Sequence, residues 1–355
     1  MRKDRVMIAA LMLSFVLLLG GCAPGQDNEN AGMPEPDRSL SAYSASFLEL
    51  FDTVTYLKGY AKDEEAFKLK AQEFYDRLYN YHRLYDIYND YEGIKNIKYL
   101  NDHAGETVTV DPELMDLLVF SKDIAGKTGG RVDITLGAVL SLWHEAREYS
   151  INNPEEAYIP GIGELEEAKK HTGFDKLKLD TEKNTVLYLD PLLRLDVGAV
   201  AKGYAVQQVC GMTEPGMLVS VGGNVAATGP KADTGSSWTV GVQDPFGTTN
   251  TYMNKVALSR GAIVSSGDYQ RRFTCNGKTW HHIIDPDTLY PAELWHGVTV
   301  ICSDSGIADA LSTALFLSDL ETGNQLLKDY GAEAVWTAMD GSIYYSDGFE
   351  KLIVK

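Results

Sequence analysis

The chain has 355 residues and a formal net charge of −18. An excess of acid this large argues against binding to nucleic acid and against a basic patch for anionic lipid, because both ligands repel a negative surface. The four cysteines include no C-x-x-C pair, so a thiolate metal site is not expected.

The first 22 residues have the pattern of a lipoprotein signal peptide. Basic residues within the first five positions precede an apolar run, Val6–Leu19, which is too short to cross a bilayer comfortably. Small residues then lead into Cys22, as in a bacterial lipobox. We expect cleavage before Cys22 and lipidation of its side chain, which would anchor the protein to the cell membrane on the extracytoplasmic face. An uncleaved signal anchor is the alternative, and the small residues before Cys22 argue against it.

Residues 23–46 are expected to form a flexible spacer. They are mostly Gly, Pro, Asn, Asp, Glu and Ser with few large apolar side chains, so they bury too little surface to order themselves. No linker-like composition recurs after position 47, and the remaining chain is long enough for a sizeable core. We therefore expect one compact domain over residues 47–355.

The first part of this domain combines one strand with two helices. Residues 51–57 are rich in β-formers and predict an opening strand. Apolar and aromatic side chains recur at helical spacing over residues 63–86, which predicts a long amphipathic helix. The signal Asp111-Pro112-Glu113 opens a second helix, and the pair Gly129-Gly130 ends it.

Short β-type runs dominate the rest of the chain. After the segments 132–135 and 140–143, a helix is expected near 162–171, and another begins behind Ser303 or Asp304 and continues through Phe316. Further strands are predicted at 176–180, 185–189, 193–197, 217–221, 238–243, 255–258, 262–265, 297–302, 333–338 and 342–346. Strands outnumber helices and include hairpin-like neighbours, so the pattern predicts an α+β fold with mixed β-sheets flanked by helices rather than a doubly wound parallel sheet.

The segment 194–205, with the sequence RLDVGAVAKGYA, is the most informative part of the chain. An apolar run ends in Asp196 and Gly198, and a helical pattern follows at once. A strand, a tight turn and a helix N-terminus in that order form an anion site, because free backbone N–H groups and the positive end of the helix dipole point at the ligand. Lys202 adds a cation, and Gly198 and Gly203 allow the backbone to approach a ligand closely.

Two further regions carry candidate chemistry. Asp309 and Thr313 lie four residues apart on a predicted helix, so a carboxylate and a hydroxyl share one face as hard ligands for Mg²⁺. From spacing alone, an acid favoured by the helix dipole is the simpler explanation. His282 is the best candidate for proton transfer, because the usual pKa of histidine lies near working pH. A histidine satisfied within a half-buried strand is the alternative.

Five other segments follow 194–205 in a fixed order. They are 219–224 (VSVGGN), 238–245 (WTVGVQDP), 265–269 (SSGDY), 281–286 (HHIIDP) and 308–314 (ADALSTA). Together these segments resemble the ApbE-type flavin transferases, and the resemblance extends from about Phe51 to the C-terminus. It implies a single ApbE-like, T-fold-like domain. It also implies a FAD:protein FMN transferase, which uses Mg²⁺ to move the FMN moiety of FAD onto a threonine hydroxyl of an exported or membrane redox protein and releases AMP.

The resemblance also implies roles for individual residues. The metal would be held by the backbone carbonyl of Ala199 and by the side chains of Asp309, Ser312 and Thr313, with Mn²⁺ able to replace Mg²⁺. FAD would be bound as the substrate by Phe51, Arg131, Val132, Asp133, Asp196, Lys202 and the backbone of Ile283. His282 and Lys202 would be the catalytic residues, the first taking the proton of the attacking hydroxyl and the second stabilising charge.

Two other functions are compatible with the same residues. An FAD pyrophosphatase would use the same metal with water as the acceptor and would release FMN and AMP. A flavin-binding lipoprotein without enzymatic activity would bind FAD and never release AMP. If the chain is a transferase, the resemblance implies that its partner is an acceptor flavoprotein subunit with a threonine-containing flavinylation motif. Leu289 stands where a glycine is usual in the family, which leaves the geometry of that turn open.

Overall fold

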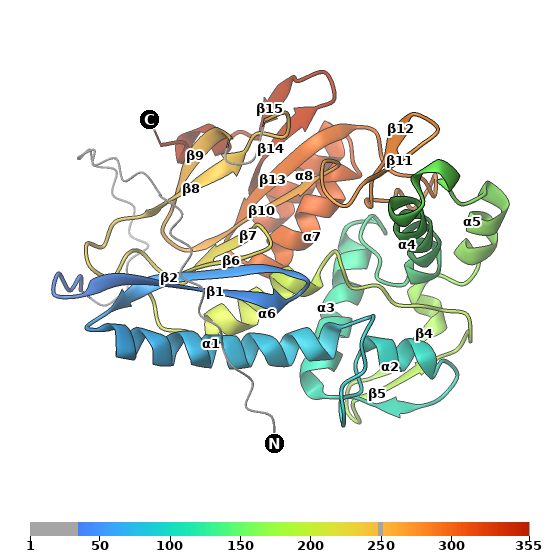
Figure 1. Ribbon diagram of the computed structural model, residues 1–355, viewed down its shortest axis with the longest axis horizontal. Helices are drawn as coiled ribbons and strands as arrows, with labels where there is room; N and C mark the ends of the chain where they lie inside the picture. The colour runs from blue at the N-terminus through green and yellow to red at the C-terminus, as the bar shows by residue number, and fades with distance from the viewer. Residues whose placement is uncertain (1–34, 248–250, 355) are drawn as a thin grey trace.

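The computed structural model describes residues 35–247 and 251–354 (Figure 1). The expected signal peptide with Cys22 and the spacer up to residue 34 lie outside the described residues. Within the part of the chain that is described, no helix combines the length and the apolar character needed to span a bilayer.

An eight-stranded sheet forms the centre of the molecule (Figure 1). Its strands, in spatial order, are β1 (Ser41–Leu50), β2 (Thr53–Ala61), β6 (Leu218–Val221), β7 (Asn224–Ala227), β10 (Gly261–Gly267), β13 (Trp295–Cys302), β14 (Glu333–Ala338) and β15 (Ile343–Tyr345). Every pair of neighbours in it is antiparallel, and β1–β2, β6–β7 and β14–β15 are hairpins. The α+β architecture predicted from the sequence is therefore confirmed.

Different elements cover the two faces of this sheet. Helices α1 (Glu64–Tyr85), α6 (Ala201–Gly211), α7 (Ser305–Phe316) and α8 (Leu320–Tyr330) pack on one face, and the hairpin β8 (Trp238–Gln243)–β9 (Tyr252–Leu258) packs on the other. Successive side chains of a strand point to opposite faces. Ala226 and Val300 accordingly belong to the core under the helices, whereas Val225 and Ile301 belong to the core under the hairpin.

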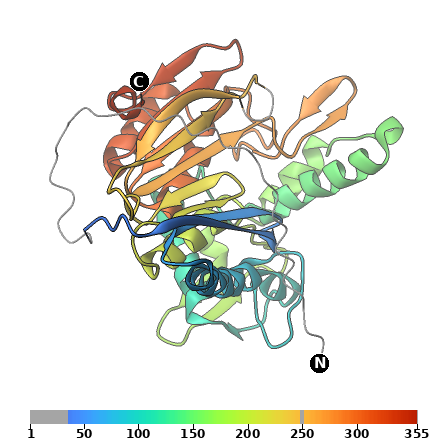
Figure 2. The same cartoon turned by 60° about the vertical axis from the view of Figure 1, so that its left-hand side comes forward.

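A smaller lobe projects from the side of the sheet, as the green and orange segments of Figure 2 show. It contains α4 (Gly137–Asn152), α5 (Ile162–Lys169) and the hairpin β11 (Phe273–Cys275)–β12 (Lys278–Trp280), which share a core of their own. The remaining elements are α2 (Ile97–Asp102), α3 (Pro112–Lys127), the three-stranded sheet of β3 (Val108–Thr109), β5 (Thr185–Tyr188) and β4 (Leu177–Asp180), and 3₁₀ turns at Pro154–Glu156, Phe174–Lys176 and Phe349–Leu352.

Leu289 anchors this lobe in a turn that would suit glycine. Its φ is 63°, a left-handed conformation that glycine adopts most readily. Its side chain is buried in the core of the lobe, and its carbonyl accepts a hydrogen bond from Nε1 of Trp143 at 2.9 Å. The leucine therefore keeps the backbone conformation expected of glycine and adds buried apolar surface.

Part of the predicted spacer belongs to the folded domain. Strand β1 starts at Ser41, so residues 41–46 belong to the sheet and not to a flexible spacer. The prediction rested on the scarcity of large apolar side chains. An edge strand needs few of them, because the backbone pairing with β2 stabilises it and only one face meets the core, here through Tyr43 stacking on Phe67 at 5.7 Å.

Two other features differ from the sequence-based expectation. Residues 193–197 form no strand: Arg194 makes one isolated bridge with Leu136, and the N–H of Leu195 donates to Oδ1 of Asn101 at 2.8 Å. The N–H of Asp196 also donates to the carbonyl of Ile134 at 2.8 Å, so backbone and side-chain contacts together hold a segment that is too irregular for a strand. Helices α2, α4 and α8 were not predicted at all, and residues 140–143 lie inside α4.

Gly203 allows α6 and α7 to pack closely. A Cβ at this position would lie far inside van der Waals contact with Cβ of Asp309 and with the carbonyl oxygen of Ser305. Two helix backbones approach this closely only where a side chain is missing, so Gly203 sets the separation of the two helices.

We predict that Gly203→Ala destabilises the protein by at least about 2 kcal/mol, because one helix must move away from the other. Gly211→Ala, at the other end of α6, is the matched control: nothing lies within 4 Å of its Cβ, so its stability should stay within about 1 kcal/mol of the wild type. Urea unfolding followed by circular dichroism measures both. Equal stabilities of the two variants would contradict the packing argument.

Candidate functional site

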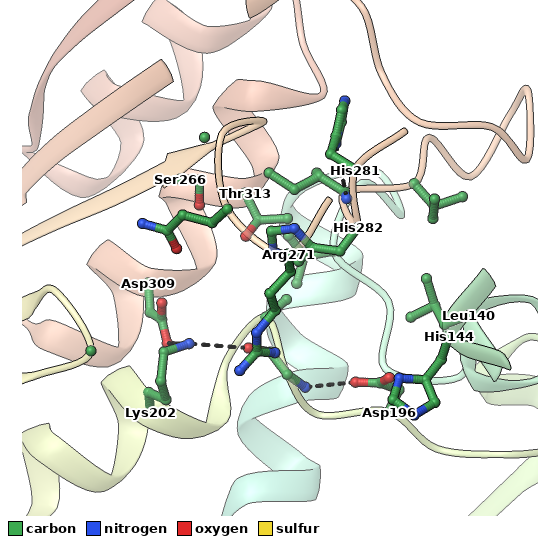
Figure 3. A pocket seen from close by; sticks show the side chains of 18 of the residues that line it. Leu140, His144, Asp196, Lys202, Ser266, Arg271, His281, His282, Asp309 and Thr313 are labelled. Atoms are coloured by element: carbon green, nitrogen blue, oxygen red, sulfur yellow. Dashed lines mark hydrogen bonds and ion pairs between the residues drawn. The ribbon is translucent and has the colours of Figure 1, made fainter. Parts of the chain in front are cut away.

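A cavity of about 300 Å³ lies between the sheet, the N-terminus of α6, α7 and α4. It brings together residues that are far apart in the sequence. The described candidates that line it are Phe51, Arg131, Val132, Asp133, Asp196, Ala199, Lys202, His282, Ile283, Asp309 and Thr313. Ser312 is the exception, because it is fully buried and does not reach the cavity surface. Figure 3 shows Lys202 and Asp309 on one side of the cavity and Asp196 with His144 on the other.

The start of α6 fixes the position of a buried acid. The N–H of Gly203 donates to Oδ2 of Asp309 at 2.7 Å, and Nζ of Lys202 lies 4.0 Å from the same oxygen. Asp309 is only 5% exposed, and burial raises the pKa of its carboxyl, an effect that Lys202 and the Gly203 N–H oppose. The helix N-terminus and the lysine thus stabilise negative charge at the base of the cavity.

Hydroxyl groups surround this acid. Oγ of Ser312 donates to the carbonyl of Asp309 at 2.8 Å and lies 2.8 Å from Oγ of Ser266. Ser266 and Thr313 line the cavity, so these two side chains, rather than Ser312, present hydroxyls to a ligand in this conformation. Ser266 belongs to the segment 265–269, but the sequence did not indicate a role for this residue.

The oxygen atoms present fit a magnesium ion that takes further ligands from a phosphate. Among the described residues, no group of three or more His, Cys, Asp or Glu side chains could hold a metal. One carboxylate from Asp309, a hydroxyl from Thr313 and the nearby Ala199 backbone form a sparse, hard-oxygen set. Mg²⁺ commonly keeps water and phosphate oxygens in such sites and is not enclosed by protein alone.

Asp196 lies across the cavity, next to the turn that precedes α6. Its Oδ1 accepts a hydrogen bond from the N–H of Gly198 at 2.8 Å. Burial raises the pKa of this carboxyl, and the Gly198 N–H and the charge of Arg271 oppose the increase. Asp196 therefore orders the turn at the predicted anion site and also lines the cavity.

The turn between β1 and β2 contributes Phe51 under backbone strain. Phe51 and Asp52 have φ values of 53° and 51°, which for non-glycine residues is an unfavourable left-handed conformation. His82 of α1 supports the turn, because its Nδ1 accepts the N–H of Phe51 at 3.2 Å. Its Nε2–H then donates to the hydroxyl of Tyr91 at 3.1 Å, and Tyr91 donates to Asp86 at 2.8 Å. The sequence gave no signal for this support.

The segment 131–133 is held from two sides. Nη1 of Arg131 makes ion pairs with Asp287 at 2.9 Å and Asp285 at 3.4 Å. Oδ1 of Asp133 accepts hydrogen bonds from both the N–H and the hydroxyl of Thr135, at 2.8 and 2.6 Å. The carboxyl of Asp133 therefore caps a turn and also lines the cavity.

The two adjacent histidines have different environments. His281 is satisfied: its Nε2 bonds the carbonyl of Ala292 at 2.8 Å, and its Nδ1 accepts the N–H of Ile283 at 3.2 Å. His282 lines the cavity, and its Nδ1 has no hydrogen-bond partner among the described residues. Burial, followed by the charge of Arg271, lowers the pKa of His282 to about 3. His282 is thus a neutral imidazole with a free nitrogen at neutral pH.

Three basic side chains of the cavity wall were missed from the sequence. They are His144 and Arg147 on α4 and Arg271 in the bend between β10 and β11. The ring of His144 packs on Tyr88 with centroids 5.1 Å apart, and its Nδ1 lies 3.0 Å from Nη2 of Arg147. A helical pattern over 137–152 could have revealed the α4 wall, whereas nothing in the sequence marks Arg271.

The sequence of the chain matches the family model of the ApbE family over residues 51–336. The chain belongs to the ApbE family. A FAD:protein FMN transferase of Treponema pallidum is 33% identical over 268 residues, which cover 70% of this chain and 72% of that protein. A FAD:protein FMN transferase of Klebsiella pneumoniae is 26% identical over 350 residues, which cover 95% of this chain and 94% of that protein.

Solved structures of ApbE proteins share the fold. The crystal structure of the ApbE protein from Thermotoga maritima has a TM-score of 0.78 and 29% sequence identity, and the match covers 89% of this chain and all of that one. The flavin transferase ApbE from Vibrio cholerae has a TM-score of 0.71 at 23% identity, over 88% of this chain and 99% of that one. The single ApbE-like domain expected from the sequence is therefore present.

We predict that His282 makes the empty protein less stable in mild acid. The pKa of His282 is about 3 in the folded chain, whereas the ordinary value of 6.5 applies to the unfolded chain. As the pH falls below 6.5, the unfolded chain therefore binds a proton that the folded chain does not, and the stability of the fold decreases. Between about pH 7.5 and about pH 5, this effect of His282 should lower the free energy of unfolding by about 2 kcal/mol. Urea unfolding of the wild type and of His282→Gln at both pH values measures the difference. An equal loss of stability in the two proteins would contradict the burial of His282.

Proposed function

We propose that the chain is a FAD:protein FMN transferase that attaches FMN to a threonine hydroxyl and releases AMP. The observation that carries the proposal is one cavity, in a chain of the ApbE family, that joins the α6 N-terminus, Lys202 and Asp309 to the free imidazole of His282. The first three groups suit a metal-bound diphosphate, and the imidazole suits a hydroxyl that loses its proton.

Asp309, Thr313 and the Ala199 carbonyl would hold the metal, with Ser312 reaching it only after its hydroxyl leaves Ser266. Mg²⁺, or Mn²⁺ in its place, would supply positive charge to the diphosphate oxygens. Lys202 and the N–H groups at the start of α6 stabilise the additional negative charge that develops there. Phe51, Asp196, Ile283 and the segment 131–133 would contact the rest of FAD.

The reaction is a displacement at phosphorus. The threonine oxygen of the acceptor forms a bond with the phosphorus next to riboflavin, while the bond from this phosphorus to the bridging oxygen breaks. AMP leaves with that oxygen, and the proton of the threonine moves to His282. Burial disfavours the imidazolium in the empty cavity, but the negative charge of a bound diphosphate favours it. Positioning of the reactants and stabilisation of charge supply most of the acceleration of the reaction.

The location of the protein is part of the proposal. Lipidation of Cys22 would hold the domain at the extracytoplasmic face of the cell membrane. An acceptor flavoprotein subunit that is exported or bound to the membrane would then meet the enzyme on the same surface. FAD is the substrate and leaves no flavin on this chain.

We predict that purified full-length protein, incubated with FAD, Mg²⁺ and a candidate acceptor, makes the acceptor fluorescent on a denaturing gel. Asp309→Ala should lower the labelling rate at least about 100-fold, because the site loses its only acidic metal ligand. Asp329→Ala, an exposed acid on α8, is the control and should label at the wild-type rate. Equimolar FMN and AMP with an unlabelled acceptor would indicate a pyrophosphatase instead. FAD binding with no AMP release would indicate a flavin-binding protein.

We also predict that Lys202→Ala weakens FAD binding about tenfold, because a charge-assisted contact to phosphate is lost. Lys328→Ala, an exposed lysine on α8, should bind FAD as the wild type does. Quenching of flavin fluorescence measures both affinities. An unchanged affinity in Lys202→Ala would remove this residue from the binding site.

A further inference from the structure

Arg271 differs from the other arginines of the cavity in having no partner among the residues that the structure describes. Arg131 is paired with Asp285 and Asp287, and Arg147 contacts Glu148 at 3.0 Å. Within the described residues, the guanidinium of Arg271 makes no hydrogen bond and no ion pair, although it is exposed to the cavity. A guanidinium carries five N–H donors in a fixed plane, so this one is free to bind an anion.

The backbone at Arg271 is in an unfavourable conformation. Its φ is 42°, in the left-handed region, where a residue with a side chain is less stable than glycine by about 1 kcal/mol. Arg271 gains nothing in return from burial, since it is exposed. Strain of this kind concentrates where a side chain must be aimed at a ligand.

The guanidinium lies at the centre of the cavity. Figure 3 shows Arg271 between His282 and Thr313 above it and Lys202 and Asp196 below it. Its charge acts on His282, where it is the largest effect after burial, and also on Asp196 and His144. Arg271 is therefore close to the proton acceptor and to both walls of the site.

We infer that Arg271 binds the phosphate next to riboflavin, the phosphoryl group that the enzyme transfers. The inference rests on the proposed function. His282 takes the proton of the hydroxyl that attacks this phosphorus, so the phosphate must lie beside His282, where Arg271 already is. Two parallel N–H donors match two non-bridging phosphate oxygens. Lys202, near the start of α6, and Asp309 of α7 remain for the metal-bound side of the diphosphate.

The charge of Arg271 also affects when His282 can accept a proton. In the empty cavity the charge of Arg271 opposes protonation of His282. A phosphate bound to Arg271 neutralises that charge, so His282 becomes a better proton acceptor only when FAD is in place. Arg271 thus couples substrate binding to the basicity of His282.

Binding of flavin fragments tests this assignment. Calorimetry with riboflavin, FMN and AMP, each added to full-length protein, separates the phosphate next to riboflavin from the other one. Arg271→Gln should bind FMN at least about tenfold more weakly than the wild type, with unchanged affinity for riboflavin and AMP. Arg271→Lys, which keeps the charge but not the fork of donors, should fall in between. Arg271→Gly keeps the left-handed backbone and should behave as Arg271→Gln does if the glutamine variant folds poorly.

Arg272→Gln is the matched control, because Arg272 is the exposed neighbour and does not line the cavity. It should bind all three compounds as the wild type does. Wild-type affinity of Arg271→Gln for FMN would overturn the inference. An equal loss of affinity for riboflavin would also overturn it, and so would any loss of affinity for AMP. A wild type that shows no preference for FMN over riboflavin would overturn it as well.

A second readout follows His282 directly. In an NMR titration of the protein without flavin, Arg271→Gln should raise the pKa of His282, whereas Arg272→Gln should leave it unchanged. No change in Arg271→Gln would contradict the placement of Arg271 beside His282. The calorimetry and the NMR titration require no acceptor protein and no catalytic turnover. A wild type that fails to label an acceptor would therefore count against the proposed function alone.

Discussion

The close contact between Gly203 of α6 and Asp309 of α7 determines the geometry of the site. Because residue 203 has no side chain, its N–H reaches the carboxylate and holds it beside Lys202. Burial of a carboxylate is unfavourable, and the N–H, the helix dipole and the ammonium group only partly offset the loss of hydration. The charge of the acid is therefore only partly compensated, and Thr313 and Ala199 line the same cavity.

Local charge, rather than net charge, explains how so acidic a chain can bind an anionic dinucleotide. Some charges around the cavity are already paired, as Arg131 and Arg147 show. Others are not fully compensated, among them the buried acid Asp309 and the guanidinium of Arg271, which has no partner among the described residues. A diphosphate that carries a divalent metal offers a cation to the first and oxygens to the second. A bare anion or a bare metal would satisfy only one of them.

The sequence predicted the fold class, and it named candidate residues most of which the structure brings to one cavity. Motifs around 194–205, 281–286 and 308–314 are local, so their residues could be named before their positions in space were known. Helix α4 was missed although its buried residues Val139, Trp143, Ala146 and Ser150 follow helical spacing, because the short apolar run 140–143 has the length and composition of a strand. Contacts between distant segments could not be predicted. The support of Phe51 by His82 and the aim of Arg271 both depend on backbone angles that no residue pattern encodes.

The pair His281-His282 shows why the structure is needed to assign chemistry to neighbouring residues. Both side chains are buried enough to have a lowered pKa, so burial alone does not distinguish them. Hydrogen bonding does: both ring nitrogens of His281 are used by the backbone, which fixes its tautomer and leaves no lone pair for a substrate. His282 keeps Nδ1 free. A buried nitrogen without a partner is costly, and that cost is removed when a hydroxyl donates to it. In the proposed complex with the acceptor, the threonine hydroxyl would supply this missing hydrogen bond.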